Sequence, residues 1–283
     1  PAAMPRYAIC NETFGDMDPK AALSMAADAG YTGWEVAPFM LGKLESDQPW
    51  ITHFDLDARH RYRDLVTDAG LEILGIHWLL AHTTGFHLTT RNTSVRLATA
   101  NHFNELIDLC ADLGGSIMVL GSPGQRNRTE GQSMDEAMAN AADVLRSALP
   151  KCQERNVKIA LEPLGPSEGN FLNTADEARQ LMAMIDDPAI GLHLDVKAMS
   201  TEAMPIDQVI RNHADSMIHF HANDPNLLGP GMGDVAFEPI MQSLADVQYN
   251  GWISVEVFDY TPGVETIVHQ SIANLKRFES LRA

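Results

Sequence analysis

The segment KIALEPLGPSEGNFLNTADEARQLMAMIDDPAIGLHLD (residues 158–195) contains the pattern that decides the fold. It begins with a short apolar run, continues with a longer stretch of helical period, and ends with a second short apolar run. Asn173 or Thr174 can cap the helix ahead of Glu177, and residues 187–188, Asp-Pro, close it before the second run. A strand, a helix and a strand in this order are typical of a βαβ unit with parallel strands.

The same alternation runs along the whole chain and predicts eight strands. They cover residues 7–11, 33–37, 72–78, 116–121, 158–162, 191–195, 217–221 and 252–257. One intervening helix carries a clear apolar stripe, formed by Phe103, Leu106, Ile107, Cys110 and Leu113. A chain of 283 residues with no Pro- or Ser-rich linker and no low-complexity tract suits one closed barrel. We therefore predict an α/β fold, a single-domain (β/α)₈ TIM barrel over residues 1–283.

The composition disfavours several classes of partner. The chain has 20 Lys and Arg against 38 Asp and Glu, and its net charge of −18 would repel a nucleic-acid backbone. No stretch approaches the ~20 uninterrupted apolar residues of a membrane span, and no export signal is recognisable. Three scattered cysteines fit neither a disulfide framework nor a thiolate zinc site. We expect a cytoplasmic protein that binds neither nucleic acid nor a membrane.

Four of the predicted strands end in a residue that can bind a metal ion: Glu162, Asp195, His221 and Glu256. The carboxyl ends of barrel strands open into one shared mouth, and successive separations of 33, 26 and 35 residues each suit one βα repeat. Three carboxylates buried together are very costly, and a divalent cation would compensate them. Three carboxylates with one imidazole favour Mn²⁺ or Mg²⁺, with Zn²⁺ or Co²⁺ as alternatives. The competing interpretation is four independent strand-end residues, each neutralised by its own partner.

With this set of residues the chain resembles the xylose isomerase-like barrel superfamily, in particular its ketose 3-epimerases and hydroxypyruvate isomerases. Segments 162–166, 193–199, 219–226 and 229–233 also resemble bacterial members known only as sugar phosphate isomerases or epimerases. The resemblance implies one divalent metal ion bound by Glu162, Asp195, His221 and Glu256. It also implies that Glu162 and Glu256 are catalytic, one removing a proton beside a carbonyl and the other returning it on the opposite face. The metal would stabilise the enediolate that forms in between.

Two departures from the epimerase pattern concern the substrate contacts. The epimerases have a His three residues after the Asp and an Arg six residues after the His, where this chain has Ala198 and Leu227. Period-two alternation puts His193, Asp195 and Lys197 on one face. Lys197 could therefore reach the mouth and bind an oxyanion, or it could simply begin a surface loop.

Four more residues are candidate substrate contacts or supports. Glu35 and His77 lie near the ends of the second and third strands, although a salt bridge for Glu35 and a core hydrogen bond for His77 explain them as well. Arg126 follows the fourth strand and could hold a carboxylate or phosphate. Glu168 stands where the epimerases carry a substrate-contacting Glu.

The remaining signals concern the surroundings of this mouth. We expect His193 and His219 to support the metal ligands from behind, or to fill the barrel. The Gly-rich run 229–233 lacks the Lys-Ser/Thr of a phosphate loop and fits a loop around substrate better. The long loops at 39–56 and 82–92 should lie over the active site.

The sequence thus predicts a divalent-metal-dependent isomerase or epimerase that acts on a small sugar or keto acid. A lyase of the inosose-dehydratase type is an alternative, because it starts from the same proton abstraction. An endonuclease IV-like phosphodiesterase shares the fold, but it needs several zinc ions and the acidic charge disfavours it. A non-catalytic carbohydrate sensor is the third alternative. A homo-oligomer is compatible with the sequence, which carries no interface signature.

Overall fold

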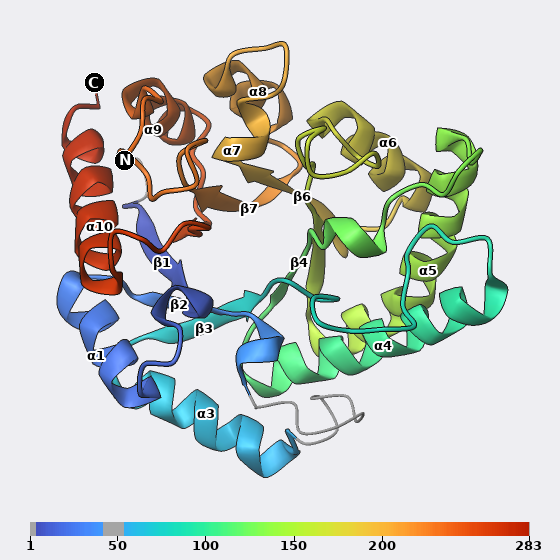
Figure 1. The fold of residues 1–283 in the computed structure, drawn as a ribbon, viewed down its shortest axis with the longest axis horizontal. Coiled ribbons are helices and arrows are strands. Elements are labelled where there is room, and N and C mark those ends of the chain that lie inside the picture. Colours follow the sequence, from blue (N-terminus) through green and yellow to red (C-terminus); the bar gives the residue numbers. More distant parts are fainter. Residues whose placement is uncertain (1–3, 42–53, 283) are drawn as a thin grey trace.

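The computed structural model describes residues 4–41 and 54–282, in which eight parallel strands close into a barrel in sequence order (Figure 1). β1 pairs with β2 on one side and with β8 on the other. The strands are β1 Arg6–Cys10, β2 Gly33–Val36, β3 Glu72–Ile76, β4 Ile117–Leu120, β5 Lys158–Leu161, β6 Ile190–Asp195, β7 Met217–Ala222 and β8 Trp252–Val255. Each predicted strand is present within two residues of its expected ends, and the predicted (β/α)₈ barrel is confirmed.

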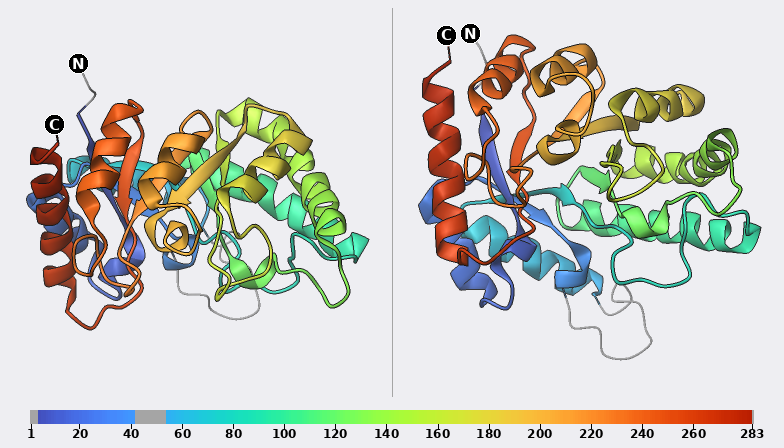
Figure 2. Two further views of the ribbon diagram at one scale, coloured as in Figure 1. Left: turned by 90° about the horizontal axis from the view of Figure 1, so that it is seen from above. Right: turned by 45° about the horizontal axis from the view of Figure 1, so that its top comes forward.

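Helices surround the barrel, as two further views show (Figure 2). The longer ones are α1 Pro19–Ala29, α3 Leu56–Asp68, α4 Thr93–Asp112, α5 Met134–Arg155, α6 Ala175–Ile185, α8 Ile206–His213, α9 Phe237–Asp246 and α10 Val264–Ser280. Short turns of helix follow several strand ends directly: η1 Asn11–Phe14, η2 Pro38–Met40, η3 Pro123–Gln125 and α7 Val196–Met199. The last helix returns to the first strand, because the hydroxyl of Tyr7 donates a hydrogen bond to Glu279.

Local sequence signals set where the helices begin. Five helices within the described ranges start at a residue whose side-chain oxygen accepts a hydrogen bond from the backbone N–H three residues later: Asp18, Asp55, Asn92, Ser133 and Thr174. Of the two caps predicted for α6, the structure uses Thr174. The stripe predicted for α4 is fully buried, which confirms that this helix packs on the barrel through that face.

The interior of the barrel differs from the apolar layer between strands and helices. Several strand residues with polar side chains are completely buried: Glu35, His193, His219, His221 and Ser254. Buried polar groups need partners, so this interior layer must be organised by its own hydrogen bonds. These residues lie next to the candidate site.

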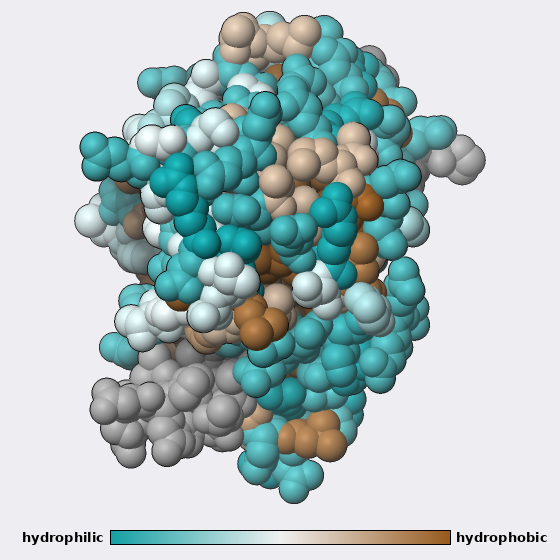
Figure 3. Space-filling view, turned by 90° about the vertical axis from the view of Figure 1, so that its right-hand side faces the viewer, coloured by the Kyte–Doolittle hydropathy of each residue, from teal (hydrophilic) through white to brown (hydrophobic). Residues whose placement is uncertain are grey.

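The face seen in Figure 3 is mainly hydrophilic, and hydrophobic residues appear on it only in small patches. Among the described helices, none combines the length and the apolar character that crossing a bilayer requires.

Candidate active site

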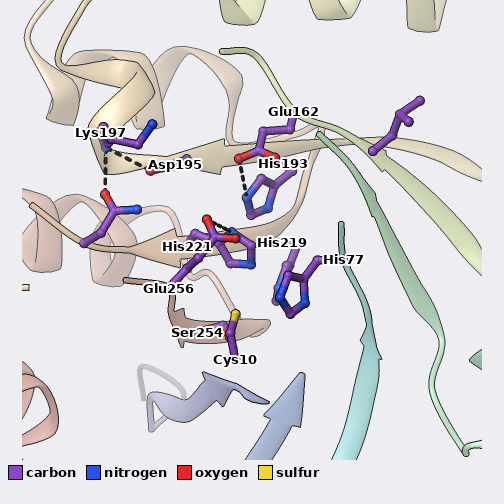
Figure 4. A network of polar contacts seen from close by, with 12 residues as sticks. Cys10, His77, Glu162, His193, Asp195, Lys197, His219, His221, Ser254 and Glu256 are labelled. Carbon is purple, nitrogen blue, oxygen red and sulfur yellow. Dashed lines mark hydrogen bonds and ion pairs between the residues drawn. The ribbon is translucent and has the colours of Figure 1, made fainter. Parts of the chain in front are cut away.

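The ends of β5 to β8 bring together the residues predicted to bind a metal ion. Glu162, His221 and Glu256 each offer a ligand atom within 4.8 Å of the others. Asp195 pairs in register with His221 and lines the same pocket as the two glutamates. All four residues are buried, and the most exposed of them is Glu162 at 6%. Figure 4 shows them gathered in one region, where they come from four consecutive strands.

These four side chains do not each have a partner of their own. In the described part of the chain, the nearest basic group to Glu162 is His193, whose Nε2 lies 3.7 Å from Oε1 and makes no hydrogen bond with it. Burial raises the pKa of Glu162 well above its ordinary value, and the neighbouring Glu256 and Asp195 raise it further. Burial and Glu256 also raise the pKa of Asp195. The interpretation of four independently neutralised residues therefore does not describe Glu162.

Glu256 has different surroundings from Glu162. Its Oε1 lies 3.1 Å from Nδ1 of His221. Burial opposes ionisation of Glu256, but His221 and His77 together outweigh it and lower the pKa of the carboxyl group. The two glutamates therefore face one pocket from unlike electrostatic environments.

The donor set fits a divalent cation. Oδ1 of Asp195 accepts a hydrogen bond from the backbone N–H of Lys197, whereas its buried Oδ2 has no hydrogen-bond partner in the described structure. A buried oxygen without a partner is costly, and a cation would satisfy it. Carboxylate oxygens with one imidazole nitrogen suit Mn²⁺ or Mg²⁺ better than a thiol-seeking metal.

Glu35 lies beneath this pocket and does not line it. Oε1 of Glu35 lies 2.5 Å from Nε2 of His219, and Oε2 lies 2.7 Å from Nε2 of His221. Nδ1 of His77 also lies 2.8 Å from Oε2. Burial opposes ionisation, but His221, His219 and His77 together lower the pKa of Glu35 well below its ordinary value. The predicted substrate contact is not seen, because Glu35 lies within β2 rather than beyond its end and is fully buried in the barrel. The salt-bridge interpretation describes it.

The other histidines of the barrel lie either on the wall of the pocket or behind it. His77 lines the pocket, and its Nε2 lies 2.8 Å from Oε2 of Glu12. His219 lies behind the pocket, where its Nε2 hydrogen-bonds with Glu35. His193 is also fully buried, with its ring centroid 4.1 Å from that of His221. The structure thus places both His193 and His219 behind the candidate ligands, where a supporting role was expected.

Lys197 reaches the pocket from the first turn of α7. Its Nζ lies 2.6 Å from Oε1 of Glu168 and 4.6 Å from the centroid of the Phe258 ring. Burial opposes the charge, but Asp195 and Glu168 outweigh it and raise the pKa of the ammonium group. Lys197 and Glu168 both line the pocket, side by side, as a cationic donor and an anionic acceptor.

Arg126 is not in the pocket. It is 1% exposed, and its guanidinium donates hydrogen bonds to the carbonyl oxygens of Leu120 and Leu172, both at 3.2 Å. Burial lowers its pKa to about 10. The predicted hold on a substrate anion is not seen, because the side chain is buried after the turn that follows β4 and joins the end of β4 to the loop around Leu172.

Sequence reasoning missed part of the pocket wall. Trp78, Ser122, Leu164 and Phe258 all line it. Trp78 and Ser122 have φ angles of 53° and 36°, in a region that side chains other than glycine seldom adopt and that is often found at functional sites. The usable signal was position, because Trp78 is the last residue of the predicted third strand and Phe258 directly follows the predicted eighth strand.

The loops expected over the site are placed as follows. No residue of 82–92 lines the pocket, and this loop instead hydrogen-bonds to the loop after β4 through Leu88 and Thr89. In the other long loop, residues 42–53 lie outside the described part of the chain. The Gly-rich run 229–233 does not line the pocket either; its Gly231 N–H donates a hydrogen bond to Asp224.

Comparisons with known proteins show the family to which the fold belongs. The family model for the xylose isomerase-like TIM barrel matches residues 23–278. A probable ketose 3-epimerase of Synechocystis sp. is 25% identical over 186 residues, which cover 62% of this chain and 62% of that protein. A D-psicose 3-epimerase of Enterocloster bolteae is 32% identical over 120 residues, or 42% of this chain and 40% of that protein. The matches thus span less than two thirds of these relatives' own length.

Solved structures share the fold. A 3-keto-D-glucoside 4-epimerase from E. coli superposes with a TM-score of 0.82 at 18% identity, over 97% of this chain and 100% of that chain. A D-psicose 3-epimerase with D-tagatose from Clostridium cellulolyticum H10 gives a TM-score of 0.78 at 18% identity, over 97% and 95% of the two chains. At these identities the likeness is one of fold.

Proposed function

The chain belongs to the xylose isomerase-like TIM barrel family, and from this membership we propose that it is a divalent-metal-dependent sugar isomerase or epimerase. The observation that carries the proposal is the convergence of Glu162, Asp195 and Glu256 on one pocket, with a ligand atom of His221 within 4.8 Å of those of both glutamates. The relatives named as ketose 3-epimerases support the same class of reaction.

The chemistry follows from the donor set. A divalent ion held by these four residues would draw electron density from a substrate carbonyl and acidify the neighbouring C–H bond. One of the carboxyl groups of Glu162 and Glu256 takes the proton from that carbon, and the C–H electron pair moves towards the carbonyl oxygen. The other returns a proton, to the opposite face in epimerisation or to the adjacent carbon in isomerisation.

The pocket wall suits a small hydroxylated substrate. Trp78, Leu164 and Phe258 provide apolar contact area, whereas Lys197 and Glu168 place a donor and an acceptor next to each other. Sugars present such alternating donors and acceptors along a carbon chain, and Lys197 can also receive an anionic oxygen. We therefore propose a small sugar or keto acid as the substrate.

Deuterium uptake tests this proposal. Metal-loaded protein is incubated in D₂O with a panel of ketoses, keto acids and inososes, and the recovered compounds are analysed by NMR. We expect deuterium at a carbon beside the carbonyl without loss of water. Loss of water would instead identify a lyase, and no exchange with any compound of the panel would contradict the proposal.

Glu162→Gln and Glu256→Gln test the two-glutamate mechanism in the same assay. Each should reduce exchange by about 10²- to 10⁴-fold, the usual contribution of one general acid or base. Glu279→Gln is the matched control, because Glu279 lies on the outer helix α10, where it contacts Tyr7 of β1, and does not line the pocket. Exchange that survives both pocket substitutions would mean that the mechanism is wrong.

A further inference from the structure

The two nitrogens of the His221 ring face two different carboxylates. Nε2 lies 2.7 Å from Oε2 of Glu35, on the side away from the pocket. Nδ1 lies 3.1 Å from Oε1 of Glu256, on the pocket side. Because His221 is fully buried, solvent does not compete for either nitrogen. The carboxylate at one nitrogen therefore influences what the other nitrogen can bind.

Glu35 is arranged to accept hydrogen bonds at both of its oxygens. His219 approaches Oε1 through its Nε2, while His221 approaches Oε2 through the equivalent atom. The thiol of Cys10 is a third donor, 3.5 Å from Oε2. An ionised carboxylate accepts hydrogen bonds and donates none, so both imidazoles satisfy it by carrying a proton on Nε2.

With its proton on Nε2, a neutral His221 keeps its lone pair on Nδ1. We propose that Glu35 is a positioning residue that fixes this tautomer and so presents the Nδ1 lone pair of His221 to a divalent ion. The contact of Nε2 with Glu35 is a hydrogen bond at 2.7 Å, whereas Nδ1 makes no hydrogen bond in the described structure although Oε1 of Glu256 lies 3.1 Å away, so the geometry favours the proton on Nε2. Edge-to-face contacts with the rings of His193 and His77 hold the plane of the His221 ring.

This inference rests on the proposed metal site and adds to it a residue that does not touch the metal. A carboxylate behind a histidine ligand raises its basicity and fixes its orientation, and removal of such a partner costs about 10- to 100-fold in metal affinity or activity. Glu35→Gln keeps the shape but replaces one acceptor oxygen with an NH₂ donor. One of the two imidazoles must then face a donor, and Nε2 of His221 loses its assured acceptor.

The first test uses the wild-type protein with Zn²⁺ alone, which is diamagnetic. Nitrogen-15 NMR of the histidine side chains should show His221 with a proton on Nε2 and the metal on Nδ1, with the signal identified by its loss in His221→Asn. A proton on Nδ1, or metal bound through Nε2, would overturn the proposal. This result does not depend on whether a Glu35 variant folds.

The second test is calorimetric titration with Mn²⁺ of the wild type, Glu35→Gln and Glu12→Gln. Glu12 is the matched control, because its carboxylate contacts the other nitrogen of His77 and makes no contact with His221. We expect Glu35→Gln to bind Mn²⁺ about 10- to 100-fold more weakly than the wild type. Glu12→Gln should lose much less of its affinity for Mn²⁺.

Equal affinity in Glu35→Gln and the wild type, or equal losses in both variants, would overturn the role of Glu35. A wild-type protein that binds neither Mn²⁺ nor Zn²⁺ would instead refute the metal site itself, and the inference would fall with it. A wild type that binds metal while Glu35→Gln is unaffected leaves the proposed function intact. The two failures are therefore distinguishable.

Discussion

The two halves of the barrel use polar strand residues in different ways. Strands β5 to β8 bring Glu162, Asp195 and Glu256 to the pocket, with His221 behind them. In the first half, β2 places Glu35 below the pocket, on the far side of the same His221 ring. A polar residue near a strand end can therefore serve the site in two ways, by facing the substrate or by fixing a residue that does.

Asp195→Asn, in the second half of the barrel, tests whether the residues that face the pocket bind the metal, and we expect it to have the largest effect on stability. Wild-type protein at a metal concentration of 100 times Kd should gain about 2.7 kcal/mol of stability over the metal-free protein. The variant should lose most of that gain at the same concentration, because an amide oxygen is a poorer ligand than the unpartnered Oδ2 of Asp195. Urea unfolding with Mn²⁺ and with a chelator measures both differences.

The metal-free form of this variant provides the internal check. Removing one of three mutually repelling buried carboxyl groups should leave metal-free Asp195→Asn at least as stable as the metal-free wild type. A metal-free variant that is clearly less stable would show that Asp195 has a structural role instead. Metal-dependent stabilisation equal to that of the wild type would remove Asp195 from the ligand set.

Arg126→Met tests a residue that the first half turns away from the pocket. Two buried carbonyl oxygens, those of Leu120 and Leu172, would lose a charged donor, so we expect a loss of about 1–3 kcal/mol in the free energy of unfolding. The KM of the protein that remains folded should change little. Chemical denaturation and steady-state kinetics separate the two effects. A large rise in KM with an unchanged free energy of unfolding would show that Arg126 contacts the substrate.

The sequence was sufficient for the fold and for the positions of the four residues at the ends of β5 to β8, because both follow from regular patterns. Short apolar runs predict strands, and a chargeable residue closing such a run predicts a place at the barrel mouth. Alternation shows which residues share a face, but not how deep each lies. Glu35 and Glu162 therefore look equivalent in sequence, although only Glu162 lines the pocket.

The positions of Arg126 and Lys197 depended on local geometry that no periodic pattern encodes. The chain after β4 passes through Ser122 at a φ of 36°, and the following turn directs Arg126 inward. Lys197 does reach the pocket, but it does so from the helix α7 rather than from an extension of β6. Its partners Glu168 and Phe258 come from two other loops, which sequence spacing alone did not connect with it.

The smallest effect is expected from Glu168→Gln, which bears on what the pocket recognises. The side chain of Glu168 is 31% exposed, and an ion pair of this kind contributes about 0–1 kcal/mol to stability. The free energy of unfolding should therefore change by less than about 1 kcal/mol. The informative quantity is kcat/KM for a neutral sugar compared with a keto acid, because the substitution replaces one acceptor oxygen with an NH₂ group and removes the negative charge that pairs with the ammonium group of Lys197.

We expect kcat/KM for the neutral sugar to fall by about fivefold or less, corresponding to at most about 1 kcal/mol, while the value for a keto acid rises. Lys197→Met is the matched comparison, since it keeps an apolar side chain of similar length and removes the charge that lies over the Phe258 ring. It should lower kcat/KM for the keto acid more than for the sugar. If neither variant alters the ratio between the two substrates, the pair belongs to the wall of the pocket without contacting the substrate, and specificity must come from the apolar residues around it.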